Sequence, residues 1–184
     1  SHGHTIFHQP QNNYTLQIGD GKIIAKTTGI TTINDFRSLD VSLNGQGAPL
    51  VPIGDFHLFP NYKYCINLGG FANISIKNKD TITAFDICPV NIVMNELSKK
   101  LGSEYDTNGD FAKSGNLIQD LLSQLNALVF YQQKAPKSLG REWVEEFINP
   151  LLLTNYKSED ILHTFCEHIA IQIGKYLEDE TALF

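Results

Sequence analysis

YCINLGGFANISIKNKDTITAFDICPVN, residues 64–91, joins a glycine pair, a turn and an acidic residue within one short span. An apolar run over 64–68 ends at Gly69 and Gly70. Apolar and polar residues then alternate over 73–77, which is typical of a half-buried strand. The first half of this stretch therefore predicts two strands joined at the glycine pair.

The second half predicts a turn and a third strand that carries an acid at its end. Residues 77–80 are turn formers, and the β-branched and aromatic residues of 81–85 favour a strand. Asp86 is then expected at the carboxyl end of this strand, with Pro89 in the first turn of a following helix. Because α/β proteins place their ligands at the carboxyl ends of strands, we expect the chemistry of the protein here.

The glycine pair and the acid suit phosphate binding and proton transfer. Backbone N–H groups at Gly69 and Gly70 could approach phosphate oxygens closely, although a purely structural hairpin turn is the alternative. The chain has neither a P-loop nor a dinucleotide-binding glycine motif. Asp86 has no Lys or Arg beside it in the sequence, so it is a candidate general base, with a helix-capping acid as the alternative. Burial that raised a pKa of about 3.9 by about two units would still leave it largely ionised at pH 7.

Composition narrows the class of protein. The 184 residues are 42% hydrophobic and carry a net charge of -6, as expected for an ordinary soluble globular chain. The acidic balance disfavours nucleic-acid and anionic-membrane partners. Three cysteines without paired spacing favour a reducing, cytoplasmic compartment, and no apolar run approaches the roughly 20 residues of a membrane helix. The histidines near the N-terminus lack companion ligands, so no metal site is predicted.

Short strands and helices are predicted to alternate in the first third of the chain. A strand is expected over 14–19, a helical piece over 23–26, and extended structure over the β-branched residues of 29–34. Residues 35–52 are rich in glycine and form either a solvated loop or a functional connection, and their length favours function. Residues 135–142 form either an exposed connector or a loop that reaches into a cleft.

Helical periodicity predicts three helices after the central stretch. The first covers 90–101, and the second is centred on 117–125 with Ser114 or Asn116 as its N-cap. The third covers 158–177, and its apolar residues recur on one face. No strand is expected after it.

Ordered motifs run through nearly the whole chain. They are SHGHTIFHQP, TLQIGD, GIT, DFR, NGQGAPLVP, NLGGFANISI, AFDICPVN and PKSLGRE. In this order they resemble the anhydro-N-acetylmuramic acid kinase family, with its S-H-G-Q-T, G-G-Q-G-A-P-L-V-P, N-I-G-G-x-A-N, D-x-G-P-G-N and P-K-S-T-G-R-E motifs. The resemblance implies the actin-like ATPase, sugar kinase and Hsp70 ATPase fold, in which two α/β lobes close over a cleft. Residues 1–61 would end the first lobe, including a sugar-side loop, and 62–184 would begin the second.

The resemblance also implies an enzyme. With ATP and Mg²⁺, the family phosphorylates O6 of 1,6-anhydro-N-acetylmuramic acid while water opens the anhydro bridge at C1. The product, N-acetylmuramic acid 6-phosphate, belongs to peptidoglycan recycling. The catalytic aspartate of the family corresponds to Asp86, and Asn67, Gly69, Gly70 and Asn73 would line the phosphates of ATP.

On the sugar side, the resemblance implies six substrate-binding residues. They are Arg37, Gln46, Gly47, Ala48, Pro49 and Asn91. No residue is assigned to a metal, and a homodimer is left open. The family's N-terminal G-T-S-x-D-G loop and its C-terminal glycine-rich motif are not among these residues, so we expect this fragment alone to be inactive.

The sequence departs from the family motifs at four positions. Leu39 stands where the family has a second arginine, His4 replaces a glutamine, and Cys88 and Val90 replace glycines. An arginine at the first of these positions could hold a carboxylate with two hydrogen bonds. The alternatives to the kinase are therefore a non-catalytic relative that binds sugar or a partner, and a kinase for another anhydrosugar.

Overall fold

The computed structural model shows a mixed α/β protein. It describes residues 1–48, 50–79, 81–153, 155–178 and 182–184. The chain forms two compact units, Ser1–Gly54 and Asp55–Phe184. None of the described helices is long and apolar enough to span a membrane.

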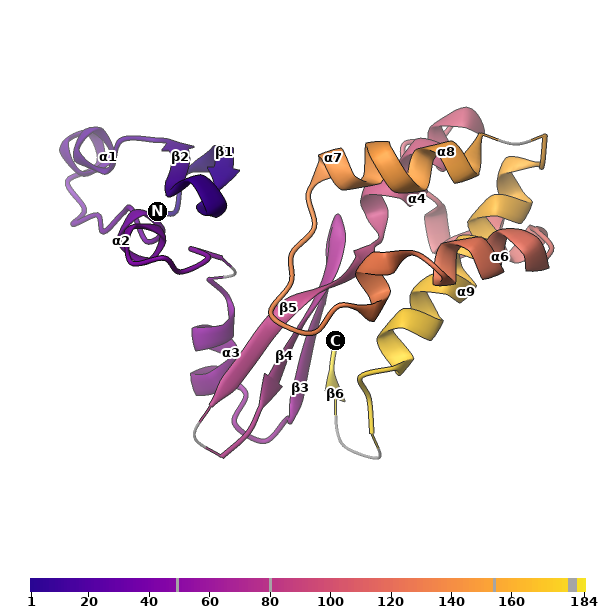
Figure 1. Cartoon of the computed structure of the whole chain (residues 1–184). Coiled ribbons are helices and arrows are strands. Elements are labelled where there is room, and N and C mark those ends of the chain that lie inside the picture. The colour runs from indigo at the N-terminus through magenta and orange to yellow at the C-terminus, as the bar shows by residue number, and fades with distance from the viewer. Residues whose placement is uncertain (49, 80, 154, 179–181) are drawn as a thin grey trace. The chain divides into compact units, whose positions relative to one another are not determined.

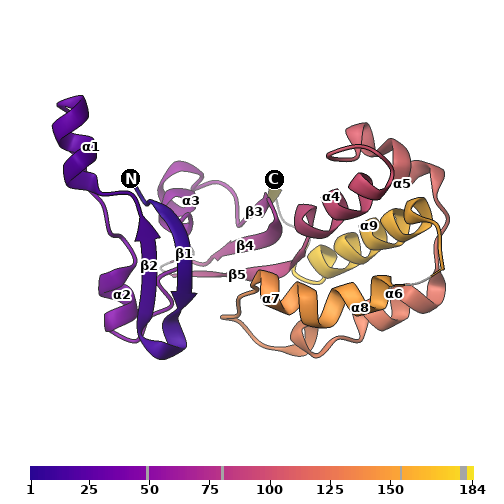
Figure 2. The ribbon, with the colours of Figure 1, turned by 90° about the horizontal axis from the view of Figure 1, so that it is seen from above.

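The first unit is built on a β-hairpin. Strand β1 (His4–Gln9) pairs antiparallel with β2 (Tyr14–Ile18), and Figure 2 shows them side by side. Helix α1 (Gly21–Thr28) follows, and the Asp20 carboxylate caps it by accepting the N–H of Lys22 at 2.7 Å. The strand and the helical piece predicted for this part of the chain are confirmed.

Two predictions for the first unit were wrong. Residues 29–34 form no strand, because they belong to neither of the two sheets of the described chain and β propensity alone does not order a strand. The segment 35–52 is not a continuous loop, since helix α2 (Ser38–Ser42) interrupts it and helix α3 (Pro52–Leu58) begins at its end. The carboxylate of Asp35 accepts the N–H of Ser38 at 3.3 Å and so starts α2.

The second unit contains a four-stranded sheet in the order β5-β4-β3-β6 (Figure 1). Strands β3 (Tyr64–Leu68), β4 (Phe71–Lys77) and β5 (Ile82–Pro89) form an antiparallel meander, as predicted from the sequence. At the β4–β5 turn, Asn78 N–H donates to the Thr81 carbonyl at 2.9 Å; Asp80, also in the predicted turn, lies outside the described residues.

Strand β6 (Ala182–Leu183) pairs in parallel with β3. The prediction that no strand follows the last helix was therefore wrong. Two residues paired with a partner more than a hundred positions earlier leave no periodic signal in the sequence.

Strand β5 is longer than predicted. It continues to Pro89, so Asp86 lies inside the strand and Pro89 ends it instead of starting a helix. Both predictions were wrong because the β4–β5 ladder extends to the pair Phe71 and Pro89. A bulge interrupts this ladder: Asn73 faces Asp86 and Ala72 faces Cys88, which leaves Ile87 as the extra residue.

Helices make up the rest of the second unit. They are α4 (Asn91–Lys100), α5 (Asp110–Ser114), α6 (Gln119–Asn126), α7 (Arg141–Trp143), α8 (Asn149–Leu152) and α9 (Ser158–Gly174), with a π turn at Val144–Ile148 between α7 and α8. The three predicted helices are confirmed as α4, α6 and α9. Neither Ser114 nor Asn116 caps α6; instead the N–H of Ile118 donates to the Thr164 hydroxyl at 2.9 Å.

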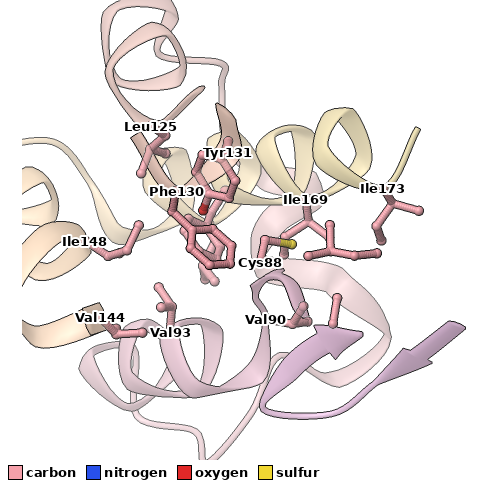
Figure 3. Packing of buried hydrophobic residues seen from close by; sticks show 14 of the residues in the cluster. Cys88, Val90, Val93, Leu125, Phe130, Tyr131, Val144, Ile148, Ile169 and Ile173 are labelled. Atoms are coloured by element: carbon pink, nitrogen blue, oxygen red, sulfur yellow. The ribbon is translucent and has the colours of Figure 1, made fainter. Parts of the chain in front are cut away.

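One face of the sheet forms the hydrophobic core with these helices. Ile66, Ile74 and Phe85 project from the sheet into the same cluster as the buried stripe of α9, whose residues recur every four positions. Members of the stripe are Ile161, Phe165, Ile169 and Ile173. Figure 3 shows Ile169 beside Cys88, with the aromatic rings of Phe130 and Tyr131 on the other side of Cys88.

The opposite face of the sheet is polar, and part of it is covered. Ser75 and Lys77 are 3% and 9% exposed, which contradicts the half-buried alternation predicted for 73–77. The end of α3 covers them: the Ser75 hydroxyl donates to the Asp55 carboxylate at 2.7 Å. The Lys77 ammonium donates to the carbonyls of Asp55 and Phe59.

Candidate active site

Three of the predicted site residues form a row on the polar face of the sheet. Asn67 on β3 pairs with Asn73 on β4, and Asn73 pairs with Asp86 on β5. Directly paired residues of antiparallel strands point to the same face, with Cβ atoms about 5 Å apart. The bulge at Ile87 is essential here, because it puts Asp86 and Cys88 on opposite faces where a regular strand would put them on the same one.

The glycine pair forms the turn at one end of this row. The φ angles of Gly69 and Gly70 lie outside the left-handed region that favours glycine. A Cβ atom would lie 3.7 Å from the Phe71 carbonyl at Gly69 and 4.0 Å from the Ile92 Cβ at Gly70, both ordinary contacts. Within the described chain, therefore, neither backbone conformation nor packing requires glycine at this turn.

The carbonyls of the glycine pair cap helix α4. The Gly70 carbonyl accepts the N–H groups of Val90 at 2.8 Å and Ile92 at 3.2 Å, and the Gly69 carbonyl accepts that of Asn91 at 3.2 Å. The donors at the start of α4 are thus already used, and this helix end has little left to offer an anion. The contacts also fix Asn91, whose side chain is exposed, next to the turn.

Asp86 is partly buried and is held by a distant segment. Its Oδ2 accepts the N–H of Leu139 at 2.8 Å, and its own N–H donates to the Lys137 carbonyl at 3.0 Å. Burial raises the pKa of Asp86, and the hydrogen bond from Leu139 opposes that rise. Among the described residues, no Lys or Arg forms an ion pair with Asp86, so its charge is not neutralised there.

The segment 135–142 is therefore more than a surface connector, a question that its sequence left open. It runs beside β5 and supplies both backbone contacts to Asp86. Sequence reasoning missed this role because the partners lie 53 positions apart. The PKSLGRE motif was the only signal of it in the sequence.

The two residues that replace family glycines turn away from the polar face. Cys88 is 0% exposed and Val90 is 6% exposed, and both belong to the hydrophobic core (Figure 3). Burial raises the pKa of the Cys88 thiol to about 12, so it is uncharged at neutral pH. Neither side chain occupies the space above Asn73 and Asp86.

In the first unit, Arg37 is brought together with the glycine loop. Its Nη1 donates to the Gly47 carbonyl at 2.7 Å, and the Gly47 N–H donates to the Asp40 carboxylate at 2.6 Å. Gly47 has φ +63°, and a Cβ there would lie 2.6 Å from the Val41 Cγ2, so the loop requires glycine. The Nε of Arg37 is buried without a hydrogen-bond partner in the described chain.

Three more predicted sugar-side residues, Gln46, Ala48 and Pro49, are close to Gly47 in the sequence. Burial and the nearby Arg37 charge lower the pKa of His8, and a hydrogen bond with the Gln46 backbone opposes this shift. Gln46 is exposed and Ala48 is partly buried, while Pro49 lies outside the described residues. In this way the structure gathers the predicted residues into two groups, one in each unit.

The fold and the site define a mixed α/β protein that presents an acid, two amides and a glycine turn together on a polar sheet face. The chain belongs to the anhydro-N-acetylmuramic acid kinase family, whose family model matches residues 1–182. The resemblance found in the motifs is thereby confirmed.

Several curated relatives of this chain are named anhydro-N-acetylmuramic acid kinase. The anhydro-N-acetylmuramic acid kinase of Photobacterium profundum is 40% identical, over 94% of this chain and 48% of its own length. That of Acinetobacter baylyi is 45% identical over 77% of this chain and 40% of its length, and that of Pseudomonas fluorescens is 37% identical over 97% and 51%. The chain spans about half the length of the curated relatives it matches.

Proposed function

We propose that the full-length protein is an ATP-dependent kinase for 1,6-anhydro-N-acetylmuramic acid. Water would add to C1 as the C1–O6 bond of the anhydro bridge breaks, and O6 would receive the γ-phosphoryl group. The product is N-acetylmuramic acid 6-phosphate, as expected in peptidoglycan recycling in the cytoplasm. The observation that carries this proposal is the row of Asn67, Asn73 and Asp86 beside the glycine turn.

The finer architecture is part of the proposal. Family membership supports an actin-like sugar kinase fold with two lobes that close over a cleft. We place the end of the first lobe in residues 1–61 and the start of the second in 62–184. The polar sheet face would then belong to the second lobe and the Arg37 loop to the first.

Asp86 is the proposed general base. One carboxylate oxygen, Oδ2, accepts the N–H of Leu139, which leaves Oδ1 to accept a proton from the attacking water. Burial raises its pKa and so brings it closer to the operating pH, which strengthens a general base as long as the group stays ionised. The proton taken from water would leave the carboxyl group neutral in its partly buried position.

The glycine turn is the proposed contact for the phosphates of ATP, with Asn67 and Asn73 alongside. Within the described chain nothing else explains two glycines here, and the Gly70 N–H makes no backbone hydrogen bond there. ATP would supply the phosphoryl group, and Mg²⁺ its charge neutralisation. No group of three or more potential metal-binding side chains lies among the described residues, so we assign no Mg²⁺ ligand in this chain.

The Arg37 loop is the proposed sugar-side contact. The lactyl group of muramic acid ends in a carboxylate, which suits a guanidinium donor. Arg37 is partly exposed, and the Gly47 carbonyl accepts its Nη1 at 2.7 Å, so the guanidinium is held beside the loop. Leu39, which stands where the family has a second arginine, is 70% exposed and therefore contributes little to packing. Gln46, Gly47, Ala48, Pro49 and, beside the glycine turn, Asn91 complete the proposed set.

A non-catalytic relative is the second candidate, suggested by the replacement of two family glycines. The burial of Cys88 and Val90 in the core weighs against it, because neither side chain crowds the polar face. A kinase for another anhydrosugar is the third candidate. The proposed partners of the full-length protein are the sugar and ATP.

Product analysis would test the three candidates together. The purified full-length protein is incubated with ATP, Mg²⁺ and one sugar at a time: 1,6-anhydro-N-acetylmuramic acid, N-acetylmuramic acid, or an anhydrosugar without the lactyl group. We expect N-acetylmuramic acid 6-phosphate and ADP from the first sugar only, identified by mass spectrometry. Absence of any phosphorylated product would favour the non-catalytic relative, and preference for the third sugar would favour a different anhydrosugar kinase.

A further inference from the structure

Segment 137–139 lies between Asp86 and the helical core and contacts both. Toward the sheet, the Lys137 carbonyl accepts the N–H of Asp86 at 3.0 Å. Two residues later, the Leu139 N–H donates to the Asp86 carboxylate at 2.8 Å. The segment thus behaves like a short extra strand along the edge of β5 at the one position where β5 carries its acid.

Lys137 anchors this segment through its side chain. The ammonium group donates to the Phe130 carbonyl at 3.0 Å and lies 4.4 Å from the centre of the Phe130 ring. It also lies 5.8 Å from the centre of the Tyr176 ring. A cation held by a carbonyl and two ring faces is fixed more firmly than an exposed lysine. Phe130 is 5% exposed, so the anchor point itself is part of the core.

We propose that Lys137 is a positioning residue for Asp86: its side chain fixes segment 137–139 on the core, and the backbone of that segment orients the carboxylate. The general-base role of Asp86 rests on the proposed function; the anchoring contact stands on its own geometry. The arrangement aligns one carboxylate oxygen by a backbone donor and leaves the other for the attacking water. Misalignment of a reacting group by about 1 Å can cost about a hundredfold in rate.

No charged side chain of the described residues faces the Asp86 carboxylate and could align it in place of segment 137–139. Asn73 from β4 and the Leu139 N–H from the segment face Asp86, and neither carries a charge. The Lys137 ammonium points to the core side, where its charge acts on the Cys88 thiol. Burial raises the pKa of Asp86, and the Leu139 N–H opposes that rise, so in the described chain the segment aligns the carboxylate and favours its ionised form.

The test compares Lys137→Met with the matched control Lys134→Met in the full-length protein. Lys134 is exposed and lies three residues before Lys137, outside segment 137–139. In protein labelled with ¹³C at the Asp carboxyl groups, the Asp86 signal is assigned by its absence in Asp86→Asn and is then titrated. We expect Lys137→Met to raise the pKa of Asp86, because the Leu139 hydrogen bond weakens, and Lys134→Met to leave it unchanged.

Kinetics provide the second readout. Lys137→Met should lower kcat about tenfold to a hundredfold with little change in the KM for ATP or sugar. An Asp86 titration identical in Lys137→Met and in the parent would overturn the proposal. A parent protein without kinase activity would overturn the proposed function instead, and the titration would still decide the role of Lys137.

A variant that removes the donor directly tests the backbone contact to Asp86. Leu139→Pro lacks the N–H that Asp86 accepts, while Lys137 remains. A raised Asp86 pKa in Leu139→Pro supports the part of the proposal in which the backbone of the segment orients the carboxylate. An unchanged titration in that variant refutes it. If Lys137→Met fails to fold, Lys137→Gln, which also lacks the ammonium, replaces it as the test of the anchor.

Discussion

Replacement of Gly70 by alanine separates a structural glycine from a ligand-binding one. Its φ lies outside the left-handed region, and a Cβ would meet only the Ile92 Cβ at 4.0 Å. At such a site alanine reduces the freedom of the unfolded chain and stabilises the fold by about 0.4–1 kcal/mol. In a chain of about 150–250 residues that gain would correspond to a rise in Tm of about 2–4 °C at most, and in the longer full-length protein to a smaller rise.

The same substitution should weaken ATP binding. A methyl group on the turn would hold phosphate oxygens away from the Gly70 N–H, and hydrogen bonds to charged groups contribute about 1.5–3 kcal/mol. We therefore expect the KM for ATP to rise about tenfold or more in Gly70→Ala, with the KM for the sugar nearly unchanged. The measurements are steady-state kinetics of the full-length kinase and thermal unfolding of the same preparations.

Gly47→Ala is the matched control. At Gly47 the left-handed φ of +63° and the 2.6 Å approach to Val41 Cγ2 require glycine, so alanine should cost about 1–3 kcal/mol. The reasoning would be refuted if Gly70→Ala lost stability as Gly47→Ala does, or if it bound ATP like the parent. Either result would make the Gly69–Gly70 turn a structural hairpin and nothing more.

Three further predictions concern stability, each read by urea unfolding. Burial and the charge of Lys175 lower the pKa of His168 to about 3, so between pH 6.5 and 5 the unfolded chain takes up this proton and the folded chain does not. The free energy of unfolding should therefore fall by about 1.6 kcal/mol over this range, and His168→Gln should lose that slope. Lys77→Met removes the ammonium that ties the end of α3 to the sheet and should cost about 1.5–3 kcal/mol, whereas Lys79→Met, at an exposed position, should cost almost nothing. Leu162→Ala, at a 0% exposed position on α9, should cost about 3–5 kcal/mol, and a smaller loss than in the 79% exposed control Leu153→Ala would contradict the assigned core.

Local sequence patterns predicted much of this fold. The meander of β3, β4 and β5 follows from alternation and turn residues, and α4, α6 and α9 follow from their apolar periodicity. These features depend on neighbours within a few residues, which a sequence pattern records. The glycine turn and the acid were also found in this way.

The features that complete the candidate site depend on distant contacts. The bulge at Ile87, which turns Asp86 toward Asn73, depends on the ladder with β4. The capping of α4 by the Gly69 and Gly70 carbonyls replaces the side-chain cap that a sequence signal would show. The hold of Leu139 on Asp86 joins residues 53 positions apart. No local pattern encodes such pairings, so they could not be predicted.

The role of Asp86 can be decided by the Asp86→Asn variant of the full-length protein, assayed with ATP and 1,6-anhydro-N-acetylmuramic acid. Asparagine keeps the shape and an oxygen that can accept the Leu139 N–H, but it cannot take a proton from water. We predict that kcat falls about 10²- to 10⁴-fold while the KM for ATP and the unfolding midpoint change little. An Asp86→Asn enzyme with the kcat of the parent would contradict the proposal that Asp86 is the general base.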